Sequence, residues 1–362
     1  MENVVNWQGK KVFITGHTGF KGGWLSLWLA HKGAILRGYA LLPPTEPNLF
    51  TDASVDSVID HVHGDVRNYV RLEAAMKEFE PQVVFHLAAQ PLVRQSYLDP
   101  VETFSTNILG TVNVLEAVRN TPSVKAVVCV TSDKVYENQE WEVWYRESDK
   151  LGGSDPYSAS KACCELVCSS YRNSFFTGIW MATARAGNVI GGGDWAKDRL
   201  IPDLMRGMYS GKATLIRNPD ATRPFQHVLD ALHGYILLAE SLLQRRQRGA
   251  FNFGPVESYK VSVIAEKLRC LSVNTVLWTT DANEQSHEEC SLRLDSKKAN
   301  EKLGWKPLLD IDTALQWTLE WYRKQHGVDM KAETLKQIRQ FESLIASQSE
   351  GALRRLEQTR QS

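Results

Sequence analysis

The chain has 362 residues, enough for one large domain or for a core domain with a smaller lobe. Lysine plus arginine and aspartate plus glutamate number 42 each, and this zero net charge argues against a nucleic-acid-binding surface. No apolar run approaches the roughly 20 residues that span a bilayer, and the N-terminus lacks the pattern of a signal peptide. We therefore expect a cytoplasmic protein with no nucleic-acid or membrane partner.

The six cysteines, which include the adjacent pair Cys163 and Cys164, show neither paired CxxC spacing nor a cluster with histidine. This pattern predicts reduced thiols, with no metal site and no structural disulfide.

The first half of the chain alternates short β-branched apolar runs with segments of helical spacing. Such repeated βα units predict a parallel sheet with helices on both faces, a doubly wound α/β fold of the Rossmann type. The expected strands are 11–15, 35–41, 82–87, 124–130 and 180–186. The expected helices are 22–33, 70–79, 107–119 and 156–175.

The pattern changes after Gly187, where an irregular polar segment begins with three glycines. A helix at 227–243 and a short strand at 250–253 are expected to return to the sheet. We predict a sheet domain, a smaller substrate-binding lobe over the carboxyl ends of the strands, where ligands bind in such folds, and a solvated helical tail. These parts are 1–187 with 226–254, then 188–225 with 255–327, and finally 328–362.

A glycine-rich turn follows the first expected strand and opens the first expected helix, with the sequence Gly16-His17-Thr18-Gly19-Phe20-Lys21-Gly22. Glycine at these places permits a tight turn and close approach of the backbone to a pyrophosphate, and the N–H groups of the helix N-terminus favour the anion. The position within a βαβ unit predicts a dinucleotide site. Its expected contacts are Gly16, His17, Thr18, Gly19, Phe20 and Gly22.

An acidic residue often follows the second strand of such a site and binds the adenosine ribose. Tyr39 to Leu42 occupy that place here, and the nearest acid, Glu46, lies beyond two prolines. The choice between NAD and NADP therefore stays open, and we expect weaker retention of the cofactor than in a site with the carboxylate.

Two later stretches carry more proton-transfer chemistry than a hydride transfer needs. Tyr157 and Lys161 stand four residues apart near the start of an expected helix, on one face. A lysine ammonium beside a phenol stabilises the phenolate, so the tyrosine can accept a hydroxyl proton near neutral pH. Ser132, Asp133 and Lys134 follow an apolar run and add a hydroxyl, a carboxyl and an amine.

These motifs, with Gly64-Asp65-Val66-Arg67 and His86-Leu87-Ala88-Ala89-Gln90, stand in the order found in the extended short-chain dehydrogenase/reductases, which the chain resembles over nearly its whole length. Within that superfamily it resembles the nucleotide-sugar 4,6-dehydratases. The stretches 186–195, 198–202 and 223–228 resemble the branch that acts on CDP-glucose. The resemblance implies an NAD-dependent lyase of deoxysugar biosynthesis, of the O-antigen or lipopolysaccharide type, that produces CDP-4-dehydro-6-deoxy-D-glucose.

The reaction implied by the resemblance gives each of the five residues a role. Tyr157, assisted by Lys161 and Ser132, would take the proton of the sugar 4-hydroxyl while hydride passes from C4 to NAD. Asp133 would protonate the departing C6 hydroxyl, which requires a buried, protonated carboxyl. Lys134 would remove the C5 proton, at a position where the wider dehydratase pattern has glutamate. A lysine that only stabilises the enolate, or only pairs with Asp133, is the alternative.

The resemblance also implies binding residues, among which arginine suits a diphosphate because its planar fork engages two phosphate oxygens. The further cofactor contacts would be Asp65, Val66, Leu87, Ala88, Ala89, Gln90 and Thr106, together with Tyr157 and Lys161. The substrate contacts would be Asn188, Arg199, Leu200, Ile201, Arg223, Asn252, His287 and Glu288.

Other functions stay open from the sequence. A nucleotide-sugar 4-epimerase would need Tyr157 and Lys161 but no acid and base for elimination, and a dehydratase could act on another nucleotide sugar. A non-catalytic nucleotide-sensing protein would not need Ser132 beside that pair. The superfamily also implies a homo-oligomer, paired through a two-helix face near 109–119 and 163–175.

Overall fold

Seven parallel strands form the central sheet of the computed structural model, which describes residues 5–137, 144–273, 275–280, 293–325 and 327–361. The strand order is β12-β7-β5-β4-β1-β2-β3, and all neighbours are parallel. The doubly wound α/β fold predicted from the sequence is confirmed. The strands are β1 (Lys11–Thr15), β2 (Ile35–Ala40), β3 (Asp60–His63), β4 (Val83–His86), β5 (Ala126–Val130), β7 (Trp180–Ala186) and β12 (Gly249–Phe253).

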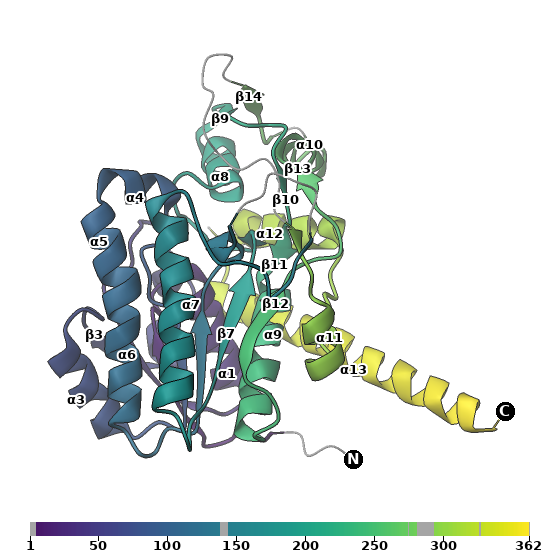
Figure 1. The fold of residues 1–362 in the computed structure, drawn as a ribbon. Helices are drawn as coiled ribbons and strands as arrows, with labels where there is room; N and C mark the ends of the chain where they lie inside the picture. The colour runs from purple at the N-terminus through teal and green to yellow at the C-terminus, as the bar shows by residue number, and fades with distance from the viewer. Residues whose placement is uncertain (1–4, 138–143, 274, 281–292, 326, 362) are drawn as a thin grey trace.

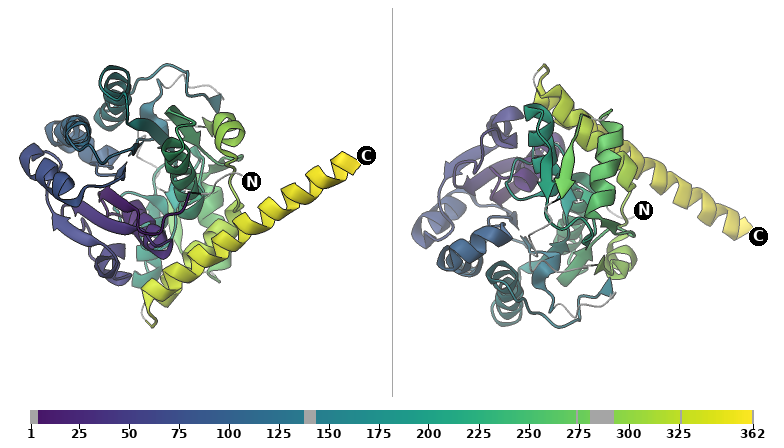
Figure 2. Two further views of the ribbon diagram at one scale, coloured as in Figure 1. Left: turned by 90° about the horizontal axis from the view of Figure 1, so that it is seen from below. Right: turned by 90° about the horizontal axis from the view of Figure 1, so that it is seen from above.

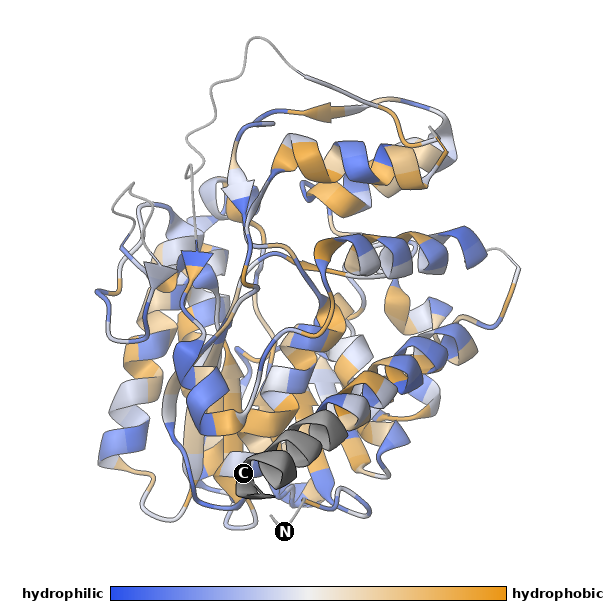
Figure 3. Cartoon of the chain, turned by 90° about the vertical axis from the view of Figure 1, so that its right-hand side faces the viewer, coloured by the Kyte–Doolittle hydropathy of each residue, from blue (hydrophilic) through white to orange (hydrophobic). Residues whose placement is uncertain are grey.

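Helices cover both faces of this sheet (Figure 1). Alternation along β1 shows the two cores, because Phe13 packs into the core on one face whereas Val12 and Ile14 pack into the core on the other. Figure 3 accordingly shows apolar strands inside helices of mixed polarity. The first face carries α3 (Tyr69–Phe79), α6 (Gly110–Arg119) and α7 (Pro156–Ser174), and the second carries α1 (Phe20–His31), α9 (Val228–Leu243) and α12 (Ile311–Lys324).

A smaller group of elements lies above the carboxyl ends of the strands, as expected for the substrate lobe (Figure 1). The chain enters it after β7 and returns through α9 to β12, which pairs with β7 at the edge of the sheet. The exact boundaries of the two parts stay a prediction. The group comprises α8 (Leu200–Ser210), β9 (Thr214–Ile216), β10 (Thr222–Arg223), β13 (Tyr259–Lys260), α10 (Val261–Leu271) and β14 (Trp278–Thr280).

Several short elements were not predicted because they carry no long periodic pattern. The edge strand β3 consists mostly of polar residues. A π-helical turn at Ser105–Leu109 precedes α6, where a continuous helix was expected. The others are α2 (Leu49–Asp52), α4 (Val93–Leu98), α5 (Pro100–Phe104), α11 (Lys297–Leu303), and the pairs β8 (Val189–Ile190) with β11 (Gln226–His227) and β6 (Trp144–Tyr145) with β15 (Arg293–Leu294).

The C-terminal helix α13 (Met330–Gln361) was expected as a solvated tail, but its first part packs on the body. Phe341 is buried edge-on against Trp28 of α1, and the Trp28 indole N–H donates to Glu342 at 2.9 Å. Figure 2 shows the rest of the helix projecting from the body. The expectation of a solvated tail was therefore wrong for the first part of the helix, because its apolar face completes the core beside α1.

The sequence predicted no structural disulfide, no metal site and no membrane-spanning segment. The cysteines at the described positions are free thiols. Within the same residues, no helix is long and apolar enough to cross a membrane, and no three metal-ligating side chains form a group.

Buried histidines make the stability of this fold sensitive to acid. Burial lowers the pKa of His17, His86 and His227 to about 3 and that of His233 to about 4. Between these values and the ordinary 6.5 the unfolded chain binds protons that the native chain does not. The free energy of unfolding is therefore expected to fall between pH 6.5 and 4, by up to about 1.4 kcal/mol per pH unit for each histidine.

Urea denaturation at a series of pH values measures this slope. His227→Gln should make the slope shallower, whereas replacement of the exposed His63 by Gln should leave it unchanged. Equal slopes for wild type and His227→Gln would contradict the assignment.

Candidate active site

The strand order reverses between β1 and β4, and the glycine-rich turn lies at this switch point. Gly16 has a φ of +76°, and a Cβ there would lie 2.6 Å from the backbone N of Ala88. A Cβ on Gly22 would lie 2.2 Å from the carbonyl oxygen of Gly16. Gly19 caps α1 with no side-chain hydrogen bond, so the first N–H groups of that helix are left for a ligand. This cradle fits the pyrophosphate of a dinucleotide.

The segment after β4 is fixed by two polar side chains. Thr15 Oγ1 lies 2.7 Å from His86 Nδ1 and accepts from the backbone N–H of Ala88 at 3.2 Å. Asn107, in the π-helical turn, accepts from the N–H of Gln90 at 2.8 Å and donates to Ser160 Oγ on α7 at 2.8 Å. This role of Asn107 was not predicted from the sequence, because a π-helical turn leaves no periodic signal.

The ends of β2 and β3 hold the region expected to receive the adenosine. The ring of His17 is buried, with Nε2 2.7 Å from His61 Nδ1, and burial keeps it neutral. Asp65 accepts from the guanidinium of Arg67 at 2.8 Å, and this hydrogen bond holds the pKa of the Asp65 carboxyl below its usual range. The side chain of His17 thus points to a neighbouring histidine, whereas Asp65 is held as a fixed acceptor.

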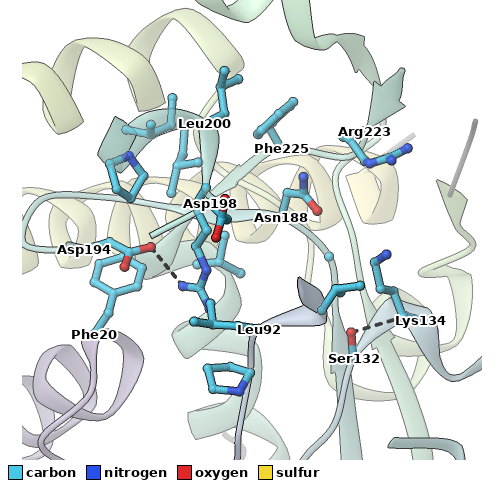
Figure 4. A pocket seen from close by; sticks show the side chains of 18 of the residues that line it. Phe20, Leu92, Ser132, Lys134, Asn188, Asp194, Asp198, Leu200, Arg223 and Phe225 are labelled. Carbon is cyan, nitrogen blue, oxygen red and sulfur yellow. Dashed lines mark hydrogen bonds and ion pairs between the residues drawn. The ribbon is translucent and has the colours of Figure 1, made fainter. Parts of the chain in front are cut away.

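A cavity of about 360 Å³ opens at the carboxyl ends of β5 and β7. Its lining brings together the five predicted catalytic residues, Ser132, Asp133, Lys134, Tyr157 and Lys161. The first three follow β5, and the last two lie in the first turns of α7. The sequence separates these groups, but the fold brings them into the lining of one cavity. Figure 4 shows Ser132 and Lys134 side by side there.

Asp133 has the environment of a carboxylic acid. It is 4% exposed, Ser132 Oγ donates to its Oδ1 at 3.0 Å, and no described group bonds to its Oδ2. Burial raises the pKa of Asp133, although the charge of Lys134 opposes the shift. The side chain can therefore hold a proton and donate it into the cavity.

Most of the predicted substrate contacts line the same cavity, and Arg199 is held there by Asp194 at 2.9 Å (Figure 4). Asn252 does not line it, because this side chain is buried, accepts from the Tyr136 hydroxyl at 2.7 Å and donates to the carbonyl of Tyr145 at 2.8 Å. His287 and Glu288 lie outside the described residues. The predicted substrate residues in the lining are Asn188, Arg199, Leu200, Ile201 and Arg223, and the predicted cofactor residues there include Phe20, Leu87 and Ala89.

The remaining predicted cofactor residues are not among those that line this cavity. Thr18 Oγ1 donates to the carbonyl of Leu41 at 2.9 Å, Val66 is buried beside the start of α6, and Thr106 belongs to the π-helical turn.

Lys21 is a further cavity residue that the sequence analysis treated only as part of the glycine motif. Its ammonium lies 6.0 Å from the centroid of the Tyr235 ring. Burial and the charge of Lys161 lower the pKa of Lys21 to about 7. A lysine between motif glycines was a visible signal of this third amine in the cavity.

A buried ion pair ties the catalytic elements together. Glu165 of α7 pairs with Arg185 of β7 at 2.8 Å, and accepts from Thr131, just after β5, at 2.6 Å and from Thr183 at 2.7 Å. Burial favours the neutral acid, but the hydrogen bond and charge of Arg185 lower the pKa of Glu165, so the pair is ionised. The pair fixes the strand end that carries Ser132 against the helix that carries Tyr157 and Lys161.

Known proteins share the sequence pattern and the fold of this chain. The family model for GDP-mannose 4,6 dehydratase matches residues 13–318. A CDP-glucose 4,6-dehydratase of Salmonella typhimurium is 47% identical over 349 residues, covering 93% of this chain and 97% of that protein. Two solved structures, both in complex with NAD, share the fold. The UDP-glucose 4-epimerase of Brucella ovis has a TM-score of 0.77, 23% identity and coverage of 87% and 98% of the two chains. The dTDP-glucose 4,6-dehydratase of Bacillus anthracis has a TM-score of 0.74, 21% identity and coverage of 88% and 98%.

Removal of the charge at Glu165 is expected to destabilise the fold strongly. Glu165→Gln leaves Arg185 buried without its counter-ion, and we expect a loss of about 3–5 kcal/mol in the free energy of unfolding, measured in urea. The matched control is Glu301→Gln, which removes an exposed pair with Lys297 and should cost less than about 1 kcal/mol. Equal losses in the two variants would show that the buried pair has no special role.

Proposed function

Because the chain belongs to the GDP-mannose 4,6-dehydratase family, we propose that it converts CDP-D-glucose to CDP-4-dehydro-6-deoxy-D-glucose and water, as a lyase of deoxysugar biosynthesis. The 47% identical relative confirms the resemblance to the CDP-glucose branch that the motifs indicated. The observation that carries the proposal is that the buried Asp133, whose pKa burial raises, lines one cavity with Lys134 and with the Tyr157 and Lys161 pair. A 4-epimerase eliminates no water and therefore needs no such acid.

We propose NAD as the cofactor, held by the cradle of Gly16, Gly19 and Gly22. The segment 87–90 would lie beside its nicotinamide and Asp65 beside its adenine. Bound NAD would take the hydride from C4 of the sugar and return it to C6. No carboxylate follows β2 for the ribose, so the glycine turn and Asp65 would provide most of the specific contacts.

In the oxidation step the phenol oxygen of Tyr157 takes the proton of the 4-hydroxyl. The ammonium of Lys161 stabilises the phenolate, and it is oriented by a hydrogen bond of 3.4 Å to the carbonyl of Val130. Ser132 donates to Asp133 and accepts from the N–H of Lys134 at 3.2 Å, so these two bonds orient its hydroxyl within the cavity lining.

In the elimination step the 4-keto group acidifies the hydrogen at C5. Lys134 removes that proton, while Asp133 gives its own proton to the C6 hydroxyl, which leaves as water. Lys134 then returns a proton to C5 as C6 is reduced. Tyr157 ends with the proton of the 4-hydroxyl and Asp133 has lost one, so both exchange with solvent before the next turnover.

We propose further that the enzyme acts in the cytoplasm as a homo-oligomer. The free thiols at the described cysteines suit a reducing compartment. Exposed apolar side chains lie on or directly after α4, α5, the π-helical turn and α7, which contact one another, and such surfaces favour association. They are Leu98, Val101, Leu109, Leu166 and Phe175, with exposures between 48% and 81%.

A panel of CDP-, UDP-, dTDP- and GDP-hexoses, incubated with NAD and analysed by mass spectrometry, tests the function. We expect CDP-glucose to lose the mass of one water. A product of unchanged mass would indicate an epimerase, and turnover of another nucleotide sugar alone would indicate a different dehydratase. A protein inactive on the whole panel would overturn the enzymatic proposal.

Solvent deuterium exchange at C5 tests the role of Lys134. We expect Lys134→Met to slow incorporation of the label by about 100-fold or more, because no other base replaces the amine. The first step should persist, seen as absorbance of the reduced cofactor. Lys197→Met, an exposed lysine outside the cavity lining, is the control and should exchange normally. Unchanged exchange in Lys134→Met would show that the amine is not the base.

A further inference from the structure

Three charged side chains from separate segments meet in the cavity, outside the catalytic group. Arg217, just after β9, places Nη2 2.6 Å from Oδ1 of Asp198, and Arg94 of α4 places Nη1 3.2 Å from the same oxygen. All three residues line the cavity. We call Asp198, Arg217 and Arg94 the Asp198 clasp.

The backbone fixes the carboxylate of this clasp. Asp198 has a φ of +59°, a left-handed conformation that costs an aspartate about 1 kcal/mol and that recurs at ligand sites. Burial opposes ionisation, but the hydrogen bond and charge of Arg217 lower the pKa of Asp198. Since both arginines bond to Oδ1, Oδ2 can accept a further hydrogen bond. The clasp therefore offers a fixed acceptor beside a guanidinium donor.

The clasp lies at the end of the cavity away from the chemistry. Figure 4 shows Asp198 and Leu200 on the opposite side from Ser132 and Lys134, with Asn188 between them. A sugar at the catalytic end and a diphosphate near Asn188 leave this end for the nucleoside. A carboxylate repels phosphate oxygens, so the clasp is unsuited to extend the diphosphate site.

The pyrimidine bases differ in the pattern that such a pair can recognise. Cytosine presents an amino donor next to the N3 and O2 acceptors, whereas uracil presents the O4 acceptor next to an N–H donor. A carboxylate only accepts hydrogen bonds and a guanidinium only donates them. A carboxylate beside a guanidinium therefore matches the amino donor and the adjacent acceptor of cytosine. Against uracil in the same orientation, the carboxylate would face the O4 acceptor and the guanidinium would face the N–H donor.

Building on the proposed function, we propose that the Asp198 clasp selects cytosine: Asp198 Oδ2 accepts from the amino group and Arg217 donates to N3 or O2. Arg94 is a positioning residue that holds the carboxylate through the second bond to Oδ1. Specificity for the base then comes from one ion pair that joins the loop before α8 to the strand β9.

Equilibrium binding of CDP and UDP to the full-length protein tests this inference. The two nucleotides carry equal charge, so the ratio of their dissociation constants is insensitive to a change in the charge of the protein. We expect wild type to prefer CDP and Asp198→Asn to reduce that preference by about tenfold or more, because an amide can also donate to O4 of uracil. Asparagine also tolerates the left-handed backbone.

Three further measurements sharpen the test. CDP that lacks the 4-amino group should bind wild type about tenfold more weakly than CDP, but should bind Asp198→Asn with a smaller penalty. Arg217→Gln should weaken CDP more than UDP. Asp220→Asn, which removes an exposed pair with Lys260 beside β10, is the control and should keep the wild-type ratio. Melting temperatures report whether each variant folds.

The outcomes separate this inference from the proposed function. If wild type turns over CDP-glucose but shows no preference for CDP, or Asp198→Asn keeps the full preference, the clasp does not read the base and the dehydratase proposal stands. Equal gains for both nucleotides in Asp198→Asn would show that the carboxylate only opposes phosphate, which also overturns the inference. Turnover of a different nucleotide sugar by wild type would instead remove the proposed function.

Discussion

The buried ion pair of Glu165 and Arg185 is the constraint on which the site depends. Ser132 ends a strand and Tyr157 begins a helix, and their relative position is only as accurate as the contact between those two elements. An apolar contact would allow the two elements to slide slightly. The carboxylate of Glu165 instead fixes direction and distance through hydrogen bonds of 2.6 to 3.0 Å to Thr131, just after β5, and to two residues of β7. Arg185 extends this order further, since it also donates to the Tyr136 hydroxyl at 2.7 Å. Tyr136 in turn bonds to Asn252, so the ordered network reaches β12 and the short pair β6 with β15.

This network explains why Asn252 was assigned to the wrong place. Asn252 was expected to contact the substrate because the resemblance places it where family members bind the nucleotide diphosphate. In the fold its neighbours are Tyr136, the carbonyl of Tyr145 and Glu147, which accepts from the Asn252 N–H at 2.8 Å. Burial among these partners satisfies the side chain and leaves nothing to offer a substrate.

The parts predicted from the sequence were those governed by local rules. The turn after β1 needs glycine because Gly16 and Gly22 nearly touch backbone, and the Tyr157 and Lys161 pair follows from helical spacing. The parts that were missed depend on contacts between distant segments. Asn107 lies in a π-helical turn, which has no sequence period. Asp198 is paired only in the fold, where one arginine on α4 and one just after β9 bond to its carboxylate. Lys21 lies within the glycine motif, but the motif does not show that its side chain lies in the cavity lining.

The charges around the cavity also bear on how fast ligands come and go. The chain is neutral as a whole, yet its cavity is lined by more basic than acidic side chains. Their combined field extends about 10 Å at ordinary ionic strength and draws in an anion before any contact is made. The same field acts on the product, which keeps the diphosphate of the substrate. The attraction that favours capture of the substrate therefore also opposes release of the product.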